Sequence, residues 1–366
     1  MDELPTLWEA EPHTIAKHGI LKTYLQAWAA IFSRSRPRPA ELLFVDGFAG
    51  PGEYQSGAIG SPLVAVEAVV NHAVKLEAPV RFLFIELRLD RWEHLRALLA
   101  SRTAQVDTSR ARLDEPLQGD CNELLTHYID NRDGSGQDLG PALFFLDQFG
   151  YSQVPMTLIG KIMAHDRCEV FSYLNFSRMN HFLADEAKWP GITAAYGDET
   201  WKRALGLTGD AREKTLLDVY TEALRRYARV RYAWPFAMFD ASGRLIHWLI
   251  FSTNNLKGLY EMKRAMWRMD KTGTFRFSDR DDPRQPTFLN DLGDAWLADE
   301  LFRRLHARRL SRAQLEAVVL TETPFFTYKA ALKLLEQAGK LKLSGMQDGR
   351  RRGVFPNNVL WSVQFL

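Results

Sequence analysis

One stretch constrains the fold more than any other: an apolar run that breaks into a glycine-rich loop and resumes as a helix. The run at 42–45 predicts a buried strand. Ser61 and Pro62 suit the N-cap and the first position of a helix over 63–70, because proline has no N–H to leave unpaired there. This order predicts an α/β sheet that presents backbone amides and a helix N-terminus to a nucleotide-like ligand. The glycines of the loop are Gly47, Gly50, Gly52, Gly57 and Gly60.

The loop resembles motif I of class I methyltransferases that use S-adenosylmethionine (SAM), and most closely the Asp-x-Phe-Ala-Gly-x-Gly pattern of nucleic-acid enzymes. A Walker A loop would need a Lys after its last glycine, and the spacing is not that of the NAD fingerprint. An ordinary strand-to-helix turn is the structural alternative. The resemblance implies SAM as the cofactor, and it assigns to the SAM site the residues Asp46, Gly47, Phe48, Ala49, Gly50, Gly52 and Ser61.

Acidic residues at the ends of later apolar runs follow the same order as in these enzymes. Glu86 ends the run at 80–85, where the resemblance implies a carboxylate that accepts both ribose hydroxyls. Asp120, after Leu117-Gln118-Gly119, resembles motif III, in which an Asp bonds the adenine amino group. Asp147 follows the apolar run at 142–146, where motif IV belongs and where open α/β sheets place ligands. A solvated surface Glu and a plain Gly-Asp turn are the alternatives for the first two.

Most of the chain also resembles the three-Cys-motif partner proteins, a group named for a genomic partnership with no established reaction. The family commonly carries Pro where Gln148 stands here. With 2 cysteines in this chain, the three-Cys motif would belong to a partner protein. The residues that carry this resemblance are Lys17-His18, Tyr24 to Trp28, Asp46 to Tyr54, Gly60-Ser61-Pro62, Phe84-Ile85-Glu86 and Asp147 to Tyr151.

Lys17 and His18 lie near the start of an amphipathic helix predicted over 13–33. A solvated helix face is their ordinary interpretation. A similar Lys-His pair precedes a similar loop in an adenine-N6 methyltransferase of large-subunit ribosomal RNA, where it borders the SAM site. That resemblance implies that Lys17 meets the methionine carboxylate as a point charge.

The predicted chemistry is methylation of an exocyclic amine on a nucleobase. Asp147 would accept an amine hydrogen, and Phe149 or Tyr151 would stack on the base. The run from Asp147 to Gly150 also resembles the Asp-Pro-Phe-Gly of transfer-RNA guanine-N2 methyltransferases. A C5-pyrimidine enzyme would need a Cys after the fourth strand, and none stands there. Two alternatives remain: Asp147 caps the next helix while Phe149 is core, or the protein is a non-catalytic nucleic-acid-binding partner with a methyltransferase-like fold.

Composition excludes several classes of protein. The chain has 366 residues, 46% of them hydrophobic, enough for a sizeable core and two domains. Two cysteines, Cys121 and Cys168, are too few for a disulfide scaffold or a Cys-rich zinc site, so no metal is expected. No signal pattern opens the sequence and no apolar run is long enough to span a membrane. We therefore expect a soluble cytoplasmic protein.

The predicted fold class is α/β, with a class I methyltransferase-like (Rossmann-like) sheet and a C-terminal winged-helix-like domain. Two strands at 232–239 and 244–252 flank a turn at Asp240 to Gly243, which is typical of the antiparallel pair that ends such a sheet. The stretch 101–115 is hydrophilic, and 130–140 is expected to be a loop. The expected organisation is a helical segment at 1–40, a methyltransferase-like domain at 41–270 with a helical insertion at 183–229, a linker at 271–293 and a winged-helix-like domain at 294–366.

The C-terminal part differs in charge from the rest. Residues 301–366 carry 12 Lys+Arg against 4 Asp+Glu, an excess of +8 in a chain whose net charge is +2. Three predicted helices and a hairpin with a basic tip resemble a winged helix, which lays one helix in the major groove and its wing on phosphates. A protein-docking winged helix is the alternative. The charge favours RNA or DNA as the partner, contacted by Arg350, Arg351 and Arg352.

Overall fold

The structure is a computed structural model that describes residues 5–103, 106–270, 276–278, 293–345, 351–357 and 360–366. It forms two compact units. The first comprises Met1–Ala265 and Phe277–Asp281, and the second comprises Met266–Arg276 and Asp282–Leu366. The predicted linker at 271–293 lies almost entirely outside the described residues.

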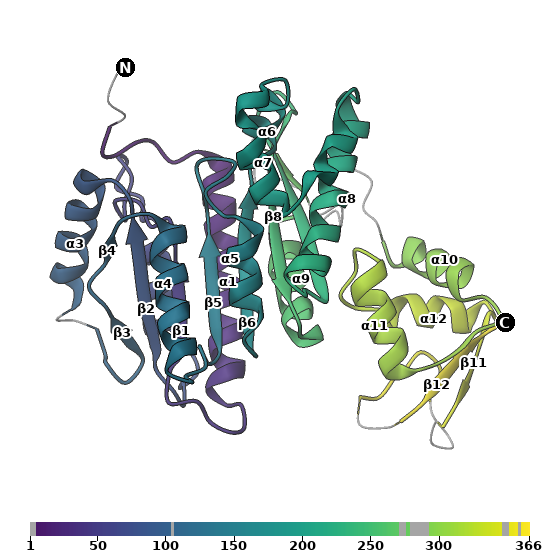
Figure 1. Ribbon diagram of the computed structural model, residues 1–366. Coiled ribbons are helices and arrows are strands. Elements are labelled where there is room, and N and C mark those ends of the chain that lie inside the picture. The colour runs from purple at the N-terminus through teal and green to yellow at the C-terminus, as the bar shows by residue number, and fades with distance from the viewer. Residues whose placement is uncertain (1–4, 104–105, 271–275, 279–292, 346–350, 358–359) are drawn as a thin grey trace. The chain divides into compact units, whose positions relative to one another are not determined.

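A mostly parallel sheet forms the centre of the first unit (Figure 1). Its order is β3-β2-β1-β5-β6-β8-β7-β9, with β4 also paired to β2. Pairing is parallel from β3 to β6, whereas β8 is antiparallel to both β6 and β7. This is the strand order of class I methyltransferases, so the predicted α/β class with a methyltransferase-like sheet is confirmed. The strands are β1 (Leu42–Asp46), β2 (Val80–Glu86), β3 (Ala111–Leu113), β4 (Leu117–Gln118), β5 (Ala142–Leu146), β6 (Cys168–Leu174), β7 (Tyr232–Phe239), β8 (Leu245–Thr253) and β9 (Arg276–Ser278).

Helices cover both faces of this sheet, and α1 lies behind the strands in Figure 1 while α4 and α5 lie in front. Because side chains alternate between the faces of a strand, buried Phe44 and Phe82 point opposite to buried Val45 and Leu83. β1 is therefore apolar on both faces. The helices are α1 (Pro12–Ser33), α2 (Ser61–Val70), α3 (Leu89–Thr103), α4 (Cys121–Gly134), α5 (Met156–Met163), α6 (Phe176–Phe182), α7 (Trp189–Tyr196), α8 (Gly209–Tyr227) and α9 (Leu256–Met269), with 3-10 turns η1 (Glu186–Lys188) and η2 (Glu199–Ala204).

Residues 183–229, predicted as a helical insertion, contain η1, α7, η2 and α8, and these elements pack on the body. Trp201 is fully buried, and Trp189 lies edge-on against it with ring centroids 5.5 Å apart. Trp201 belongs to the core that also contains Val45 and residues of α5 and α8, and Trp189 packs against that core. The insertion thus extends the main core and has no separate one.

The glycine loop depends on backbone conformations that other residues disfavour. Gly50 and Gly52 have φ of +62° and +86°, in the left-handed region where a Cβ is strained. A Cβ on Gly60 would lie 2.9 Å from the backbone carbon of Gly52, and the Gly60 N–H donates to the Gly52 carbonyl at 2.7 Å. Glycine is therefore required where the loop closes on itself.

Several local predictions were wrong. Gly60, not Ser61, is the N-cap of α2, and Ser61 is the first helical residue. The third strand is split into β3 and β4, and β3 lies within the hydrophilic stretch 101–115. Asp120 caps the N-terminus of α4 by accepting the Glu123 N–H at 3.0 Å. The helix continues to Gly134, so only the end of the predicted loop at 130–140 is irregular.

Among its described residues, the second unit contains the helices α10, α11 and α12 and a small antiparallel sheet ordered β10-β12-β11. The helices and the last two strands occur in the predicted order, whereas β10 was not predicted. Helix α10 ends at Leu305, and the chain then enters β10 at Arg309, which pairs with β12. The elements are α10 (Asp294–Leu305), β10 (Arg309–Ser311), α11 (Arg312–Glu322), α12 (Lys329–Gln337), β11 (Leu341–Ser344) and β12 (Ser362–Phe365).

Among the described residues, every helix is too short or too polar to cross a lipid bilayer.

Candidate functional site

The carboxyl ends of β1, β2 and β5 meet at one edge of the sheet. The Gly50 N–H donates to Glu86 Oε2 at 2.9 Å, and the Arg88 N–H donates to Glu86 Oε1 at 2.8 Å. The Gly47 N–H donates to the Phe145 carbonyl at 3.0 Å, which ties the glycine loop to β5. These bonds fix the loop against both neighbouring strands.

A cavity of about 770 Å³ opens at this edge, a volume in the usual range for small-molecule sites. Of the predicted SAM residues, it is lined by Gly47, Phe48, Glu86 and Asp120. They come from three different strand ends, as the sequence predicted. Gly50 and Ala49 belong to the same loop, and Gly52 turns its end. The other lining residues are Pro5, Trp8, Glu9, Glu11, Leu87, Arg88, Arg91, Gly119, Cys121, Phe149, Gln153 and Arg178.

Asp46 is fully buried immediately before these loop residues. Its Oδ1 accepts the Phe48 N–H at 3.1 Å, while Oδ2 accepts no hydrogen bond from any described residue. Burial raises the pKa of this carboxyl to about 7, an effect that the nearby Ser61 hydroxyl and the Phe48 N–H oppose. A buried acceptor without a donor is costly. Asp46 directly precedes Gly47 of the cavity lining but does not itself line the cavity.

Lys17 and Asp147, predicted for separate roles, form an ion pair. Lys17 Nζ donates to Asp147 Oδ2, and both side chains are largely buried. None of the described residues hydrogen-bonds Asp147 Oδ1. The ammonium of Lys17 is therefore already neutralised in this state of the protein, which bears on its expected contact with a cofactor carboxylate.

His18 and Cys121 are buried and uncharged near the site. Burial, with the positive charge of Lys17, lowers the pKa of His18 to about 3, so the ring is neutral near pH 7. Burial also raises the pKa of the Cys121 thiol above its usual value. Neither residue therefore supplies a charge or a thiolate nucleophile.

The segment after β5 is held by Gln148, at the position where the resembling family commonly has Pro. Its Nε2 donates to the Tyr173 carbonyl at 3.0 Å, and its Oε1 accepts the N–H groups of Gln153 and Val154 at 2.9 and 3.1 Å. Gln148 thus organises the turn through side-chain hydrogen bonds.

The two aromatic residues of this segment lie in different surroundings. Phe149 is half exposed and lines the cavity, whereas Tyr151 lies outside the cavity lining with its ring 5.1 Å from Phe182. Of the two predicted stacking residues, Phe149 is therefore the better placed, and stacking on a base stays a prediction for both.

The N-terminal segment before α1 lies across the cavity, which the sequence did not predict. The Gln55 N–H donates to the Trp8 carbonyl at 3.0 Å, and Thr6 Oγ1 donates to Asp90 at 2.7 Å. The Trp8 ring stands edge-on to Tyr54 and Phe149, with centroids 5.6 and 5.8 Å away. A short polar segment ahead of the first helix carries no periodicity, so its position could come only from tertiary contacts.

A second cavity of about 730 Å³ begins beside the first, and Glu11 lines both. Residues of β6, α6 and the β7–β8 turn form its wall. Its carboxylates outnumber its cations, since Arg244 is the one arginine in the lining and is paired with Asp240 at 3.1 Å. The lining includes Glu11, His13, Tyr173, Asn180, Asp210, Glu213, Asp240 and Arg244.

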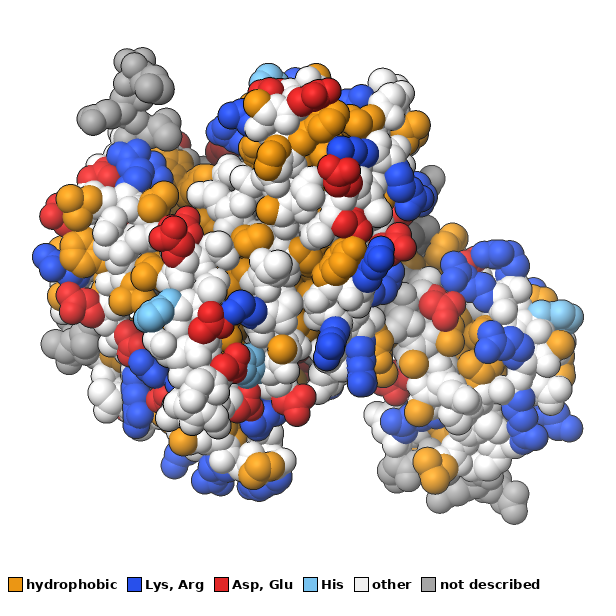
Figure 2. Space-filling view, viewed as in Figure 1, with side chains coloured by type: hydrophobic (Ala, Val, Ile, Leu, Met, Phe, Trp, Pro, Cys, Tyr) orange, Lys and Arg blue, Asp and Glu red, His pale blue; other side chains and the backbone are white. Residues whose placement is uncertain are grey.

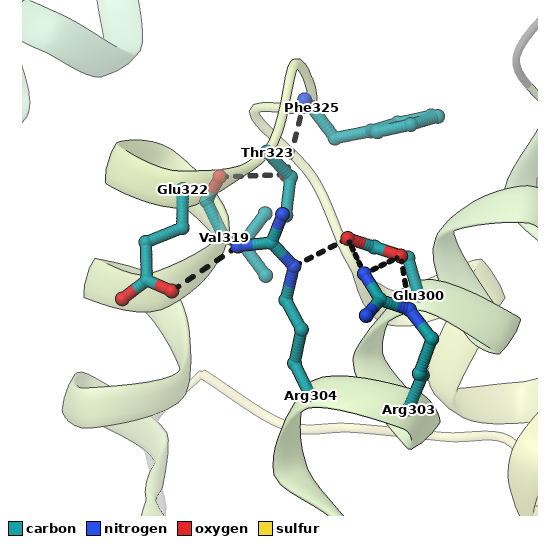
Figure 3. A network of polar contacts seen from close by, with 7 residues as sticks. All are labelled: Glu300, Arg303, Arg304, Val319, Glu322, Thr323 and Phe325. Atoms are coloured by element: carbon teal, nitrogen blue, oxygen red, sulfur yellow. Dashed lines mark hydrogen bonds and ion pairs between the residues drawn. The ribbon is translucent and has the colours of Figure 1, made fainter.

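Charges in the second unit are partly neutralised internally (Figure 3). Glu300 accepts hydrogen bonds from both Arg303 and Arg304, and Arg304 also pairs with Glu322 at 3.4 Å. Other Lys and Arg side chains are spread over the visible face of this unit (Figure 2). Of the predicted phosphate contacts, Arg351 and Arg352 are exposed, and Arg350 lies outside the described residues.

No group of His, Cys, Asp or Glu side chains within the described ranges could hold a metal ion.

The sequence matches no known family profile and no curated protein. Solved structures of similar fold include TYW2 of M. jannaschii in complex with AdoMet, at 11% identity, covering 64% of this chain and 74% of that one with a TM-score of 0.30. Another is precorrin-6y C5,15-methyltransferase of Geobacter metallireducens GS-15, at 10% identity, covering 69% and 100% with a TM-score of 0.27.

The raised pKa of Asp46 predicts a pH dependence of stability. With a pKa of about 7 when folded against 3.8 otherwise, the folded state binds more protons between these values. The contribution of protonated Asp46 to the free energy of unfolding is complete below pH ~4 and is lost as the pH rises through ~7. The free energy of unfolding should therefore fall by ~2–3 kcal/mol between pH 5 and 8. Asp46→Asn should remove this difference in the free energy of unfolding, which urea titrations at pH 5 and pH 8 would measure.

Glu169 provides a matched comparison, because burial also raises its pKa to about 7. Glu169→Gln should remove a separate part of the pH dependence of the free energy of unfolding, and the effects of the two substitutions should add. An Asp46→Asn protein whose stability keeps the full pH dependence would contradict the assignment.

Proposed function

We propose that this protein is a SAM-dependent methyltransferase that acts on an exocyclic amine of a nucleobase in RNA or DNA. The observation that carries the proposal is the cavity at the ends of β1, β2 and β4, where Glu86, Asp120 and the glycine loop converge in methyltransferase order.

The residues of the cavity suit SAM on chemical grounds. Glu86 has a carboxylate at the cavity wall whose oxygens each accept one N–H and retain a further lone pair for a ribose hydroxyl. Asp46 offers a buried acceptor to an ammonium group, and the positive φ of Gly50 brings backbone close to a ligand. SAM, when bound, supplies an activated methyl group on a sulfonium.

Asp147 would orient the acceptor amine. Lys17 occupies its Oδ2, which leaves Oδ1 to accept an amine hydrogen and hold the nitrogen lone pair toward the methyl donor. Lys17 holds the Asp147 side chain in a fixed orientation through this contact. The second cavity, rich in carboxylates, suits an amine-bearing base better than a phosphate, so the nucleic-acid backbone would remain outside it.

One observation favours the alternative, a non-catalytic nucleic-acid-binding partner. The ion pair between Lys17 and Asp147 neutralises both groups, and a protein without turnover has no need to release either. Transfer of radiolabelled methyl groups from SAM to pooled RNA and DNA separates the two functions. Incorporation supports the enzyme, whereas SAM binding without incorporation supports the partner protein.

For the second unit, we infer a winged-helix-like domain that binds nucleic acid through its exposed arginines. The order of three helices and three antiparallel strands supports it, as do the exposed Arg351 and Arg352. A protein with a three-Cys motif remains a proposed further partner, as the family resemblance implies.

Glu86→Gln tests the cofactor site. The amide keeps one acceptor oxygen but loses the charge, so SAM affinity measured by calorimetry should fall by ~1–3 kcal/mol, the scale of a lost hydrogen bond that leaves a buried donor unpaired. Glu53→Gln is a matched control from the same loop, because Glu53 pairs with His94 at 2.9 Å outside the cavity lining. Equal SAM affinity in Glu86→Gln and the parent would contradict the site.

Asp147→Asn tests the catalytic role. The variant keeps an acceptor oxygen but changes charge and proton affinity, so turnover should fall by ~10²–10⁴-fold with folding and SAM binding retained. Label transfer under saturating SAM is the measurement. Parent-like turnover, or global unfolding of the variant, would remove Asp147 from the mechanism.

Replacement of Arg350, Arg351 and Arg352 with Gln tests nucleic-acid binding. Because each phosphate contact contributes ~0.9 to the log–log dependence of affinity on salt, the slope for duplex DNA should flatten by up to about three. The control replaces Arg303 and Arg304, which Glu300 already engages, and should leave the slope nearly unchanged. An unchanged slope in the triple variant would indicate a protein-docking surface.

A further inference from the structure

Arg91 is a buried cation in the wall of the larger cavity. Its side chain belongs to α3 and the residue is 8% exposed. One Nη donates to the Pro5 carbonyl at 3.2 Å, while Nε–H has no hydrogen-bond partner among the described residues. Burial lowers the pKa of the guanidinium, which nonetheless stays protonated near pH 7 as arginine does in proteins.

Carboxylates near Arg91 are engaged elsewhere. The oxygens of Glu86 accept the backbone N–H groups of Gly50 and Arg88. Asp90 accepts hydrogen bonds from the Arg88 side chain at 2.8 and 3.0 Å. Within the described part of the chain, no carboxylate lies in ion-pair range of Arg91, so its charge is left for a ligand.

Aromatic rings hold the guanidinium in place. Its Cζ lies 4.4 Å from the centroid of the Trp8 ring and 5.8 Å from that of Phe149. Trp8 itself borders the glycine loop, since a Cβ on Gly50 would lie 3.5 Å from its ring. Arg91 is therefore close to the loop that the proposed function assigns to the cofactor.

The carboxylate is the one anionic group of SAM, and the other cations near the site are less suited to it. Lys17 is paired with Asp147, and Arg88 with Asp90. Arg178 lines the cavity but is exposed to water. A buried guanidinium with an unsatisfied N–H gains most from a carboxylate. One charge-assisted hydrogen bond then both compensates the buried charge and gives the N–H an acceptor.

We propose that Arg91, held by Trp8 of the N-terminal segment, binds the carboxylate of the cofactor's amino-acid chain, in place of Lys17. This inference rests on the proposed function and adds a specificity-determining residue to it. A cofactor that lacks the carboxylate would leave Arg91 buried without an anion, so the site discriminates against decarboxylated analogues.

The test compares S-adenosylhomocysteine with its decarboxylated analogue, which keeps the amine and loses only the carboxylate. Arg91→Gln should weaken binding of S-adenosylhomocysteine by about 10- to 100-fold, as expected for a hydrogen bond to a charged group, and leave the analogue's affinity unchanged. Arg91→Lys keeps the charge and should retain part of the discrimination. Calorimetry on the full chain measures all of these affinities.

Arg96→Gln is the matched control. Arg96 lies on the same helix with its Cζ 4.6 Å from the Trp92 ring, but it is exposed and outside the cavity lining. It should leave both affinities unchanged. Equal weakening of both ligands in Arg91→Gln, or no weakening of either, would overturn the role of Arg91, whereas a parent that binds neither SAM nor S-adenosylhomocysteine would overturn the proposed function with it.

Discussion

The parallel pairing of β1 with both β2 and β5 is the constraint on which the rest of this structure depends. Leu42–Asp46 registers with Val80–Phe84 on one side, and Leu43–Asp46 with Ala142–Phe145 on the other. Since all three strands run the same way, their carboxyl ends lie at one edge, and the chain reverses its direction of winding between β2 and β5 across β1. The glycine loop, Glu86 and Asp147 are brought together by this arrangement.

The charged side chains at this edge of the sheet are few, and most of them are buried. Lys17 and Asp147 form a pair, Asp46 has a raised pKa without a counter-ion, and Arg91 lies against aromatic rings. Breaking a buried pair or leaving a buried charge unpartnered costs more than the same change at the surface. Arg91 lies in the cavity wall, where an anionic ligand group would neutralise it, whereas Asp46 is fully buried next to that wall.

In the second unit, some of the charged side chains pair with one another at the surface. Glu300 engages Arg303 and Arg304 in an intramolecular network, so that the formal excess of positive charge overstates what is available to a polyanion (Figure 3). Arg351 and Arg352, near the end of the chain, are exposed. Counting charges along a sequence does not reveal internal pairs such as those of Glu300, because the pairing depends on which helix faces lie together.

The sequence by itself determined the strand–loop–helix order, the acidic residue that ends β2 and the antiparallel pair β7–β8, since these follow from local periodicity and turn chemistry. It also placed Lys17, Asp46 and Asp147 near one site through a family resemblance. Only the tertiary structure decided that Lys17 pairs with Asp147, that Gln148 braces its turn and that Trp8 and Arg91 lie in the cavity wall. These contacts join residues far apart in the chain, and no local pattern encodes which of several charges or rings will be buried together.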